Sequence, residues 1–165
     1  MAEKTDLKKI TPHLGDTYEI GNLKIRVLVT WEEIPMPIER FNDTTTVLMM
    51  EAEGQKIFWP GDAGEREAEY LTSHYSDDEL KADILQLAHH GFRGSSVELY
   101  EKVNAPVVLI STRQERLNDN LERATTKKAL ELAKEYYVAG NGTVMLKLPY
   151  VLGTAKVFPQ EVNTP

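Results

Sequence analysis

Cysteine is absent from the 165 residues of the sequence. This absence excludes disulfide bridges, thiolate metal sites, iron–sulfur clusters and cysteine nucleophiles. Long apolar runs are absent too, since none approaches the ~20 residues that a membrane-spanning helix needs. Residues 1–6 also lack the apolar stretch of a secretory signal peptide. We therefore expect a cytoplasmic protein without a membrane segment.

Basic residues are in the minority, with 19 Lys and Arg against 26 Asp and Glu, which gives a formal net charge of -7. Nucleic-acid affinity rests largely on Lys and Arg replacing counterions, so this balance argues against a broad nucleic-acid surface. The chain is 41% hydrophobic, which is ordinary for a globular protein. Its length suits one domain with a buried core.

Two β-hairpins are predicted in the first third of the chain. Residues 18–20 and 23–29 flank a Gly-Asn turn, and the second arm alternates apolar and polar side chains as a half-buried strand does. Residues 45–51 and 56–59 are β-prone runs on either side of a short turn, so they form the second predicted hairpin.

The remainder of the chain is predicted to alternate helices and strands. Hairpins followed by such an alternation favour an α/β fold, with a mixed sheet and helices on one face. The other face of the sheet would then be bare and would need a cover. The predicted elements are helices at 65–73, 96–103 and 121–135, strands at 84–88 and 107–110, and a third hairpin of 136–139 with 143–148.

Two loops carry residues that suit catalysis or metal binding. Asp62 follows the strand at 56–59, and His89 and His90 follow the strand at 84–88. Ligand sites of open sheets lie beyond strand ends, where neighbouring loops converge. Imidazole is the commonest protein ligand of metals, and a carboxylate suits zinc and manganese. An isolated Gly-Asp is typical of a turn, but the joint order of the two loops predicts a shared metal site.

Four stretches carry a family resemblance: NDTTTVL at 42–48, IFWPGD at 57–62, LKADILQLAHHG at 80–91 and APVVLIS at 105–111. Together they resemble the C-terminal half of metallo-β-lactamase-fold hydrolases, most of all the competence-protein (ComEC-type) domains. The LKAD run ahead of the histidine pair is the most specific part.

The resemblance implies a layout for the whole chain. The fold would be half of a metallo-β-lactamase αββα sandwich, with residues 15–158 forming the half-domain. Residues 1–14 would be a linker or a truncated edge, and residues 159–165 a tail.

The resemblance also implies roles for matched residues. Asp62 matches the metal-bridging aspartate, and His89 or His90 matches the later histidine ligand, with His89 favoured because it is nearer the strand end. Asp62 and His89 are the candidate catalytic residues, and all three are candidate metal ligands. The complete domain is expected to hold two zinc ions. Arg93 and Ser95 are candidate substrate-binding residues, although Ser95 also suits a helix cap.

Part of the family pattern is missing. The His-x-His-x-Asp-His motif, which supplies most ligands in relatives, has no counterpart, and the remaining histidines, His13 and His74, are isolated. Arg123 stands about where relatives carry a histidine before a proline. A catalytic zinc needs about three protein ligands and an open position. We therefore expect partial or no zinc occupancy, and no hydrolysis by this chain alone.

Two functions remain open at this point. In the first, the chain is the C-terminal part of a metal-dependent hydrolase, and its partner is the missing N-terminal half of the fold. The substrate would be a small molecule with a phosphodiester, ester or lactam bond. In the second, the chain is a non-catalytic binding or assembly module that pairs its bare sheet face with a second copy of itself.

Overall fold

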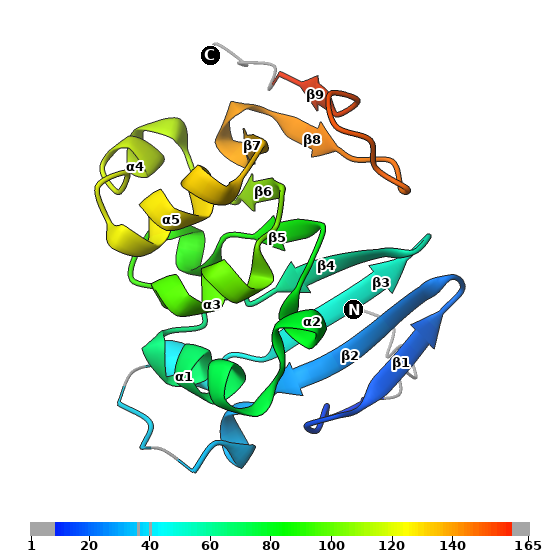
Figure 1. The fold of residues 1–165 in the computed structure, drawn as a ribbon, viewed down its shortest axis with the longest axis vertical. Coiled ribbons are helices and arrows are strands. Elements are labelled where there is room, and N and C mark those ends of the chain that lie inside the picture. Colours follow the sequence, from blue (N-terminus) through cyan, green and yellow to red (C-terminus); the bar gives the residue numbers. More distant parts are fainter. Residues whose placement is uncertain (1–8, 36, 40, 160–165) are drawn as a thin grey trace, which may run out of the picture.

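The computed structural model describes residues 9–35, 37–39 and 41–159, and within them the strands form a mixed sheet of seven and a separate pair (Figure 1). The large sheet has the order β1-β2-β3-β4-β5-β6-β7, antiparallel from β1 to β4 and parallel from β4 to β7. Its strands are β1 (Thr17–Ile20), β2 (Leu23–Val29), β3 (Val47–Ala52), β4 (Gln55–Trp59), β5 (Ile84–Gln86), β6 (Val107–Ile110) and β7 (Glu135–Val138).

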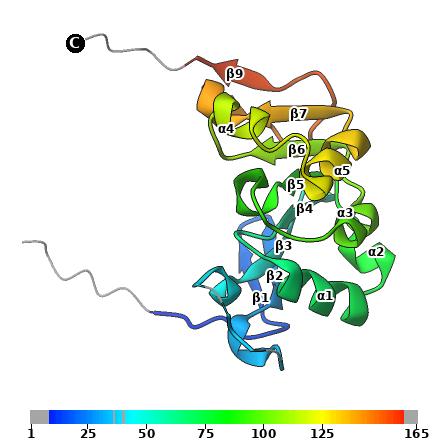
Figure 2. The same cartoon turned by 90° about the vertical axis from the view of Figure 1, so that its left-hand side faces the viewer.

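The helices cover one face of this sheet, as Figure 2 shows for α1, α2, α3 and α5. This arrangement confirms the predicted mixed α/β fold with helices on one side. Short 3₁₀ turns at Phe41–Thr44 and Ala88–Gly91 lie beside strand ends. The α-helices are α1 (Glu65–His74), α2 (Asp77–Leu80), α3 (Val97–Val103), α4 (Gln114–Asn118) and α5 (Ala124–Leu132).

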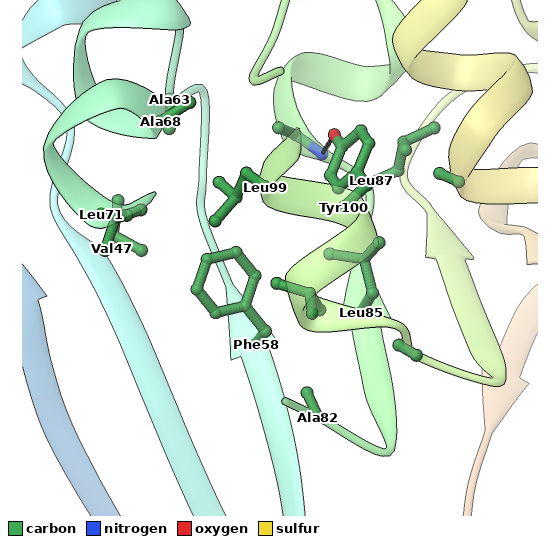
Figure 3. Packing of buried hydrophobic residues seen from close by; sticks show 14 of the residues in the cluster. Val47, Phe58, Ala63, Ala68, Leu71, Ala82, Leu85, Leu87, Leu99 and Tyr100 are labelled. Carbon is green, nitrogen blue, oxygen red and sulfur yellow. Dashed lines mark hydrogen bonds between the residues drawn. The ribbon is translucent and has the colours of Figure 1, made fainter. Parts of the chain in front are cut away.

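The core lies between the sheet and these helices. Phe58 of β4 is fully buried and points toward Leu85 of β5 and Leu99 of α3 (Figure 3). Helix α3 begins where the sequence predicts, because the Ser96 hydroxyl accepts a hydrogen bond from the Leu99 amide at 3.1 Å. The packed helices and strands hold the loops that follow β4 and β5.

The opposite face of the sheet is partly covered by the chain's own C-terminal segment. Tyr150 packs with Ile84 and Val107, and its hydroxyl donates to Glu135 at 2.6 Å. Gln55 of β4 bonds the backbone of Tyr150, accepting from its amide and donating to its carbonyl oxygen. This face is therefore less bare than the sequence predicted.

In the last third of the chain, one predicted helix is shorter than expected and one predicted hairpin is wrong. The helix expected at 121–135 forms as α5, but only over Ala124–Leu132. Residues 134 and 135 leave the helix because both backbone amides donate to the carbonyl oxygen of Pro106, which starts β7 beside β6. Helical spacing of apolar residues does not reveal this competing strand pairing.

The third predicted hairpin does not form. β7 pairs in parallel with β6, whereas β8 (Thr143–Met145) pairs antiparallel with β9 (Lys156–Phe158) in the separate sheet. The Gly140 amide donates to the Thr112 carbonyl oxygen at 2.8 Å, which ties the intervening turn to the end of β6. The turn thus directs the chain away from β7.

The ends of the chain lie largely outside the described residues, and this applies to most of the predicted linker at 1–14 and tail at 159–165. In the described part, no helix is both long and apolar enough to cross a membrane.

Candidate metal site at the ends of the parallel strands

The candidate site lies at the carboxyl ends of β4 and β5. These strands are parallel neighbours, so the loops that follow them leave the sheet at the same edge. Asp62 follows β4, and His89 and His90 follow β5. The His89 amide donates to the Gly61 carbonyl oxygen at 2.9 Å, so a backbone hydrogen bond ties the two loops together.

His90 lies between Asp62 and the loop after β6. Its Nε2 is 3.7 Å from Oδ1 of Asp62, and its Nδ1 lies 2.9 Å from the Ser111 hydroxyl. The side chains of His90 and Asp62 are 43% and 42% exposed. Both groups are therefore open to solvent and to an incoming ion or substrate.

His89 faces Asn42, a residue to which the sequence assigned no role. Nδ2 of Asn42 lies 3.0 Å from Nε2 of His89, 3.3 Å from its Nδ1, and 3.5 Å from Oδ2 of Asp62. Asn42 lies just ahead of β3 and far from both loops in sequence. Its one sequence signal is that it opens the first of the four stretches that resemble the hydrolase family.

The loops at the site adopt backbone conformations that side chains rarely favour. His89 and His90 have φ of 46° and 58°, and Gly61 has φ of 58°. Positive φ at residues other than glycine costs free energy and clusters at functional sites. A Cβ at Gly61 would lie 2.7 Å from the Thr45 hydroxyl oxygen, so glycine is required here for space as well.

Buried groups hold the histidine loop from behind. The Ala88 amide donates to the Tyr100 hydroxyl at 3.2 Å, and the Thr126 hydroxyl donates to the Gly91 carbonyl oxygen at 2.8 Å. Burial raises the pKa of Tyr100 above its ordinary value of 10, so its hydroxyl stays neutral. Gly94 packs directly on the backbone and Cβ of Ala88, which leaves no room for a larger residue.

The loop that carries Asn42 is held by a buried arginine on α1. Arg66 donates to the carbonyl oxygens of Trp31 at 3.1 Å, Ile34 at 3.2 Å and Asp43 at 2.9 Å. Its guanidinium also pairs with buried Glu67 at 2.9 Å. The position of Asn42 beside His89 is therefore part of the packed structure.

Two hollows adjoin the candidate ligands. A cavity of about 260 Å³ is lined by Asn42, Asp62, His89 and Arg93, among others. A larger hollow of about 600 Å³ lies on the other side of His90 and includes two arginines, Arg113 and Arg116. Arg93 is exposed at the edge of the first cavity.

Ser95 does not line the cavity of Asp62 and His89. It is 2% exposed, and its amide donates to the Ala63 carbonyl oxygen at 2.8 Å. Its proposed contact with substrate remains a prediction, as does that of Arg93.

The described donors at the candidate site are too few to complete a metal site on their own. Within the described residues, no group of three His, Cys, Asp or Glu side chains is arranged to hold a metal ion. A carboxylate oxygen and imidazole nitrogens nevertheless converge on one small region, and these are donors that divalent transition metals accept. A second ion would need ligands that the described residues do not offer.

No protein-family model matches this chain. Among curated proteins, it is similar to ComE operon protein 3 of Bacillus subtilis, with 28% identity over 151 residues. This match covers 88% of the present chain and 18% of that relative. The chain thus spans a small part of the relative's length.

The chain is also similar to solved structures, at lower sequence identity. One is described as a Zn-dependent hydrolase of the metallo-β-lactamase superfamily from Thermotoga maritima, with 20% identity, a TM-score of 0.41, and coverage of 75% of this chain and 59% of that one. Another is the metallo-β-lactamase fold protein YhfI from Bacillus subtilis, with 13% identity, a TM-score of 0.44, and coverage of 80% and 53%. The resemblance to the competence-protein type that the sequence predicts is confirmed by the match to ComE operon protein 3.

Proposed function

We propose that this chain supplies the C-terminal part of a metal-dependent hydrolase, with Asp62, His89 and His90 as its contribution to the metal site. The observation that carries this proposal is the convergence of these side chains from two separate loops at one edge of the sheet. A bound zinc would polarise the substrate and activate water for attack.

The chain's own residues have separable roles in this proposal. Asp62 and His89 hold the cation, while His90 is oriented by the Ser111 hydroxyl so that its Nε2 faces the Asp62 carboxylate. Arg93, exposed at the cavity edge, offers a guanidinium to a negatively charged part of the substrate. These groups do not determine whether the complete enzyme cleaves a phosphodiester, an ester or a lactam bond.

The remaining ligands come, in this proposal, from a partner segment that carries the His-x-His-x-Asp-His motif. The described donors alone are too few for a catalytic zinc site, which needs about three protein ligands. This chain by itself is therefore expected to bind zinc weakly, with partial occupancy, and to lack hydrolytic activity.

The test is zinc binding by the full chain, measured by equilibrium dialysis and elemental analysis. Wild-type protein is expected to retain weakly bound zinc, and Asp62→Ala and His89→Ala are expected to lose it. His13→Ala is a matched control because His13 is exposed and distant in sequence from the two loops. Retention of as much zinc by Asp62→Ala as by the wild type would contradict the proposal.

A non-catalytic assembly module is the second candidate function. Apolar side chains remain exposed on β4 and on the separate strand pair: Trp59 is 41% exposed and Phe158 is 48% exposed. A second copy of the chain could cover such groups. The solution mass of the purified chain separates this function from the first.

A further inference from the structure

Two hollows meet at the ends of β6 and β7, beside the candidate metal site. The first, the arginine hollow, has a volume of about 600 Å³ and is lined by His90, Arg113 and Arg116, among others. The second, the apolar hollow, has a volume of about 350 Å³. Ser111, which follows β6, and Ala139, which follows β7, line both hollows. The two hollows therefore adjoin and form one groove.

The apolar hollow is a consequence of strand register. Gln86, Leu109 and Tyr137 are register partners across β5, β6 and β7, so they form one row on the sheet face opposite the helices. Trp59 extends this row into β4, because the parallel register of β4 with β5 continues to its position. Val144 of β8 lines the same hollow from the separate strand pair. Among the described residues, no charged side chain lines it.

The arginine hollow carries positive charge without a compensating acid. No Asp or Glu of the described part of the chain lines it. Arg113 and Arg116 are exposed, and neither forms an ion pair with another described residue. A guanidinium without an acidic partner offers paired N–H donors to a phosphate, phosphonate or carboxylate group. This hollow is therefore complementary to an anion.

The segment that carries the two arginines is fixed by its neighbours. The Gly140 amide donates to the Thr112 carbonyl oxygen at 2.8 Å, and a Cβ on Gly140 would lie 2.6 Å from Cα of Arg113. The Arg116 guanidinium lies 5.9 Å from the centre of the Phe92 ring, at the distance of a cation–π contact. The arginine hollow is thus formed by packed backbone and by a ring that supports one of its cations.

We propose that this groove binds a small organic anion that has an apolar body, with the oxyanion group in the arginine hollow and the body in the apolar hollow. This inference rests on the proposed function and deepens it by naming the class of substrate. His90 lines the arginine hollow, and its Nε2 lies 3.7 Å from the Asp62 carboxylate. A bound oxyanion group would therefore lie next to the candidate metal site.

The experiment titrates the metal-free full chain with three probes and follows its backbone amide signals by NMR. Phenylphosphonate has both the ring and the charged group, methylphosphonate has the charged group alone, and benzyl alcohol has the ring alone. Phenylphosphonate is expected to shift the amides of Gly140 and Val144, one in each hollow, and to bind at least about tenfold more tightly than either fragment. The Gly21 amide, in the turn between β1 and β2, is expected not to shift. Equal affinities for phenylphosphonate and methylphosphonate would overturn the inference.

Arg113→Gln and Arg116→Gln test the charged half of the groove. Each is expected to weaken the binding of both phosphonates about fivefold or more, because each removes a charged donor. Arg26→Gln is the matched control: it removes a guanidinium from β2, where Arg26 pairs with Glu79 at 3.6 Å, and is expected to bind as the wild type does. Binding that survives both arginine substitutions unchanged would contradict the assignment of the anion to this hollow.

Trp59→Ala tests the apolar half. It is expected to weaken phenylphosphonate binding about fivefold or more and to leave methylphosphonate binding unchanged, a selectivity that general unfolding would not produce. Trp31→Ala is the matched control, since Trp31 has a similar exposure of 39% and lines neither hollow. Wild-type binding of phenylphosphonate by Trp59→Ala would overturn the inference.

The failure of this inference is distinguishable from the failure of the proposed function. Asp62→Ala is expected to keep phenylphosphonate binding in the metal-free protein, because Asp62 lines neither hollow. Zinc retention that depends on Asp62, without binding in the groove, would remove this inference alone. Binding in the groove, with equal zinc retention in the wild type and Asp62→Ala, would remove the metal site and leave the groove as a ligand site.

Discussion

Single residues at the candidate site are constrained by backbone conformation and by space. Asp62 and the histidine pair follow neighbouring strands of the sheet, and that pattern suffices to nominate them from the sequence. Asn42 is different, because its part in the site depends on the folding of a distant turn against both loops. Neither periodicity nor composition reports such a contact, so the sequence could not predict that Asn42 lies beside the two loops.

Gly61→Ala is expected to destabilise the protein by about 1–3 kcal/mol, because alanine at φ of 58° is strained and its Cβ meets the Thr45 hydroxyl at 2.7 Å. Urea unfolding measures the loss. Gly21→Ala is the matched control, since Gly21 has φ of 62° and nothing within 4 Å of an added Cβ. The Gly61 variant should lose more stability than the Gly21 variant, and equal losses would contradict the crowding at Thr45.

At the scale of elements, the C-terminal segment shows most clearly where sequence reasoning failed. The β-prone run after α5 joins the main sheet in parallel as β7, instead of turning back as a hairpin. The partner of β8 is β9, which lies beyond a loop that packs on the sheet through Tyr150. A local pattern predicts that a segment is a strand, but the strand with which it pairs depends on which edge of the sheet is still unpaired.

Glu135 of β7 binds the C-terminal segment through Tyr150. Its carboxylate accepts hydrogen bonds from the hydroxyls of Tyr150 at 2.6 Å and Tyr137 at 2.9 Å. These hydrogen bonds, that from Tyr150 foremost, lower the pKa of Glu135 below its ordinary value of 4.5. A carboxyl whose pKa is lower in the folded state than in the unfolded state adds stability above pH 4.5. That stability is lost as the pH falls through the lowered pKa.

Glu135→Gln is therefore expected to be less stable than the wild type at neutral pH, with the difference shrinking as the pH is lowered below 4.5. Urea unfolding at pH 7 and at lower pH values measures this difference. Glu122→Gln serves as the control, because Glu122 is exposed and lies just outside α5. A difference between wild type and Glu135→Gln that is the same at every pH would contradict this account.

At the scale of the whole molecule, one face of the sheet is packed with helices and the other is partly covered. The helix side contains the main core, whereas Tyr150 and its neighbours cover the middle of the opposite face at β5 and β6. Trp59 stays partly exposed beside this cover. The molecule can thus bury much of its sheet without a partner, which argues against obligate self-pairing.

The chain is expected to sediment as a monomer of 18.7 kDa at micromolar concentration, because its own C-terminal segment occupies the sheet surface that a second copy would need. Analytical ultracentrifugation over a range of concentrations measures the mass. A stable particle of twice this mass, unchanged by replacing Asp62 with alanine, would instead support the assembly module.

The local features of this protein follow from its amino-acid sequence. Alternating apolar residues predicted the second arm of the first hairpin, and β-prone runs predicted the second hairpin. Strands followed by Asp62 and by the histidine pair marked the candidate site. Such features depend on neighbours along the chain, so the sequence alone indicates them.

Which distant segments meet is known from the packed fold alone. It placed Asn42 against His89, paired β7 with β6, and laid Tyr150 over the second sheet face. These contacts depend on competition among strand edges and packed surfaces of the whole fold, and that competition leaves no periodic trace in the sequence.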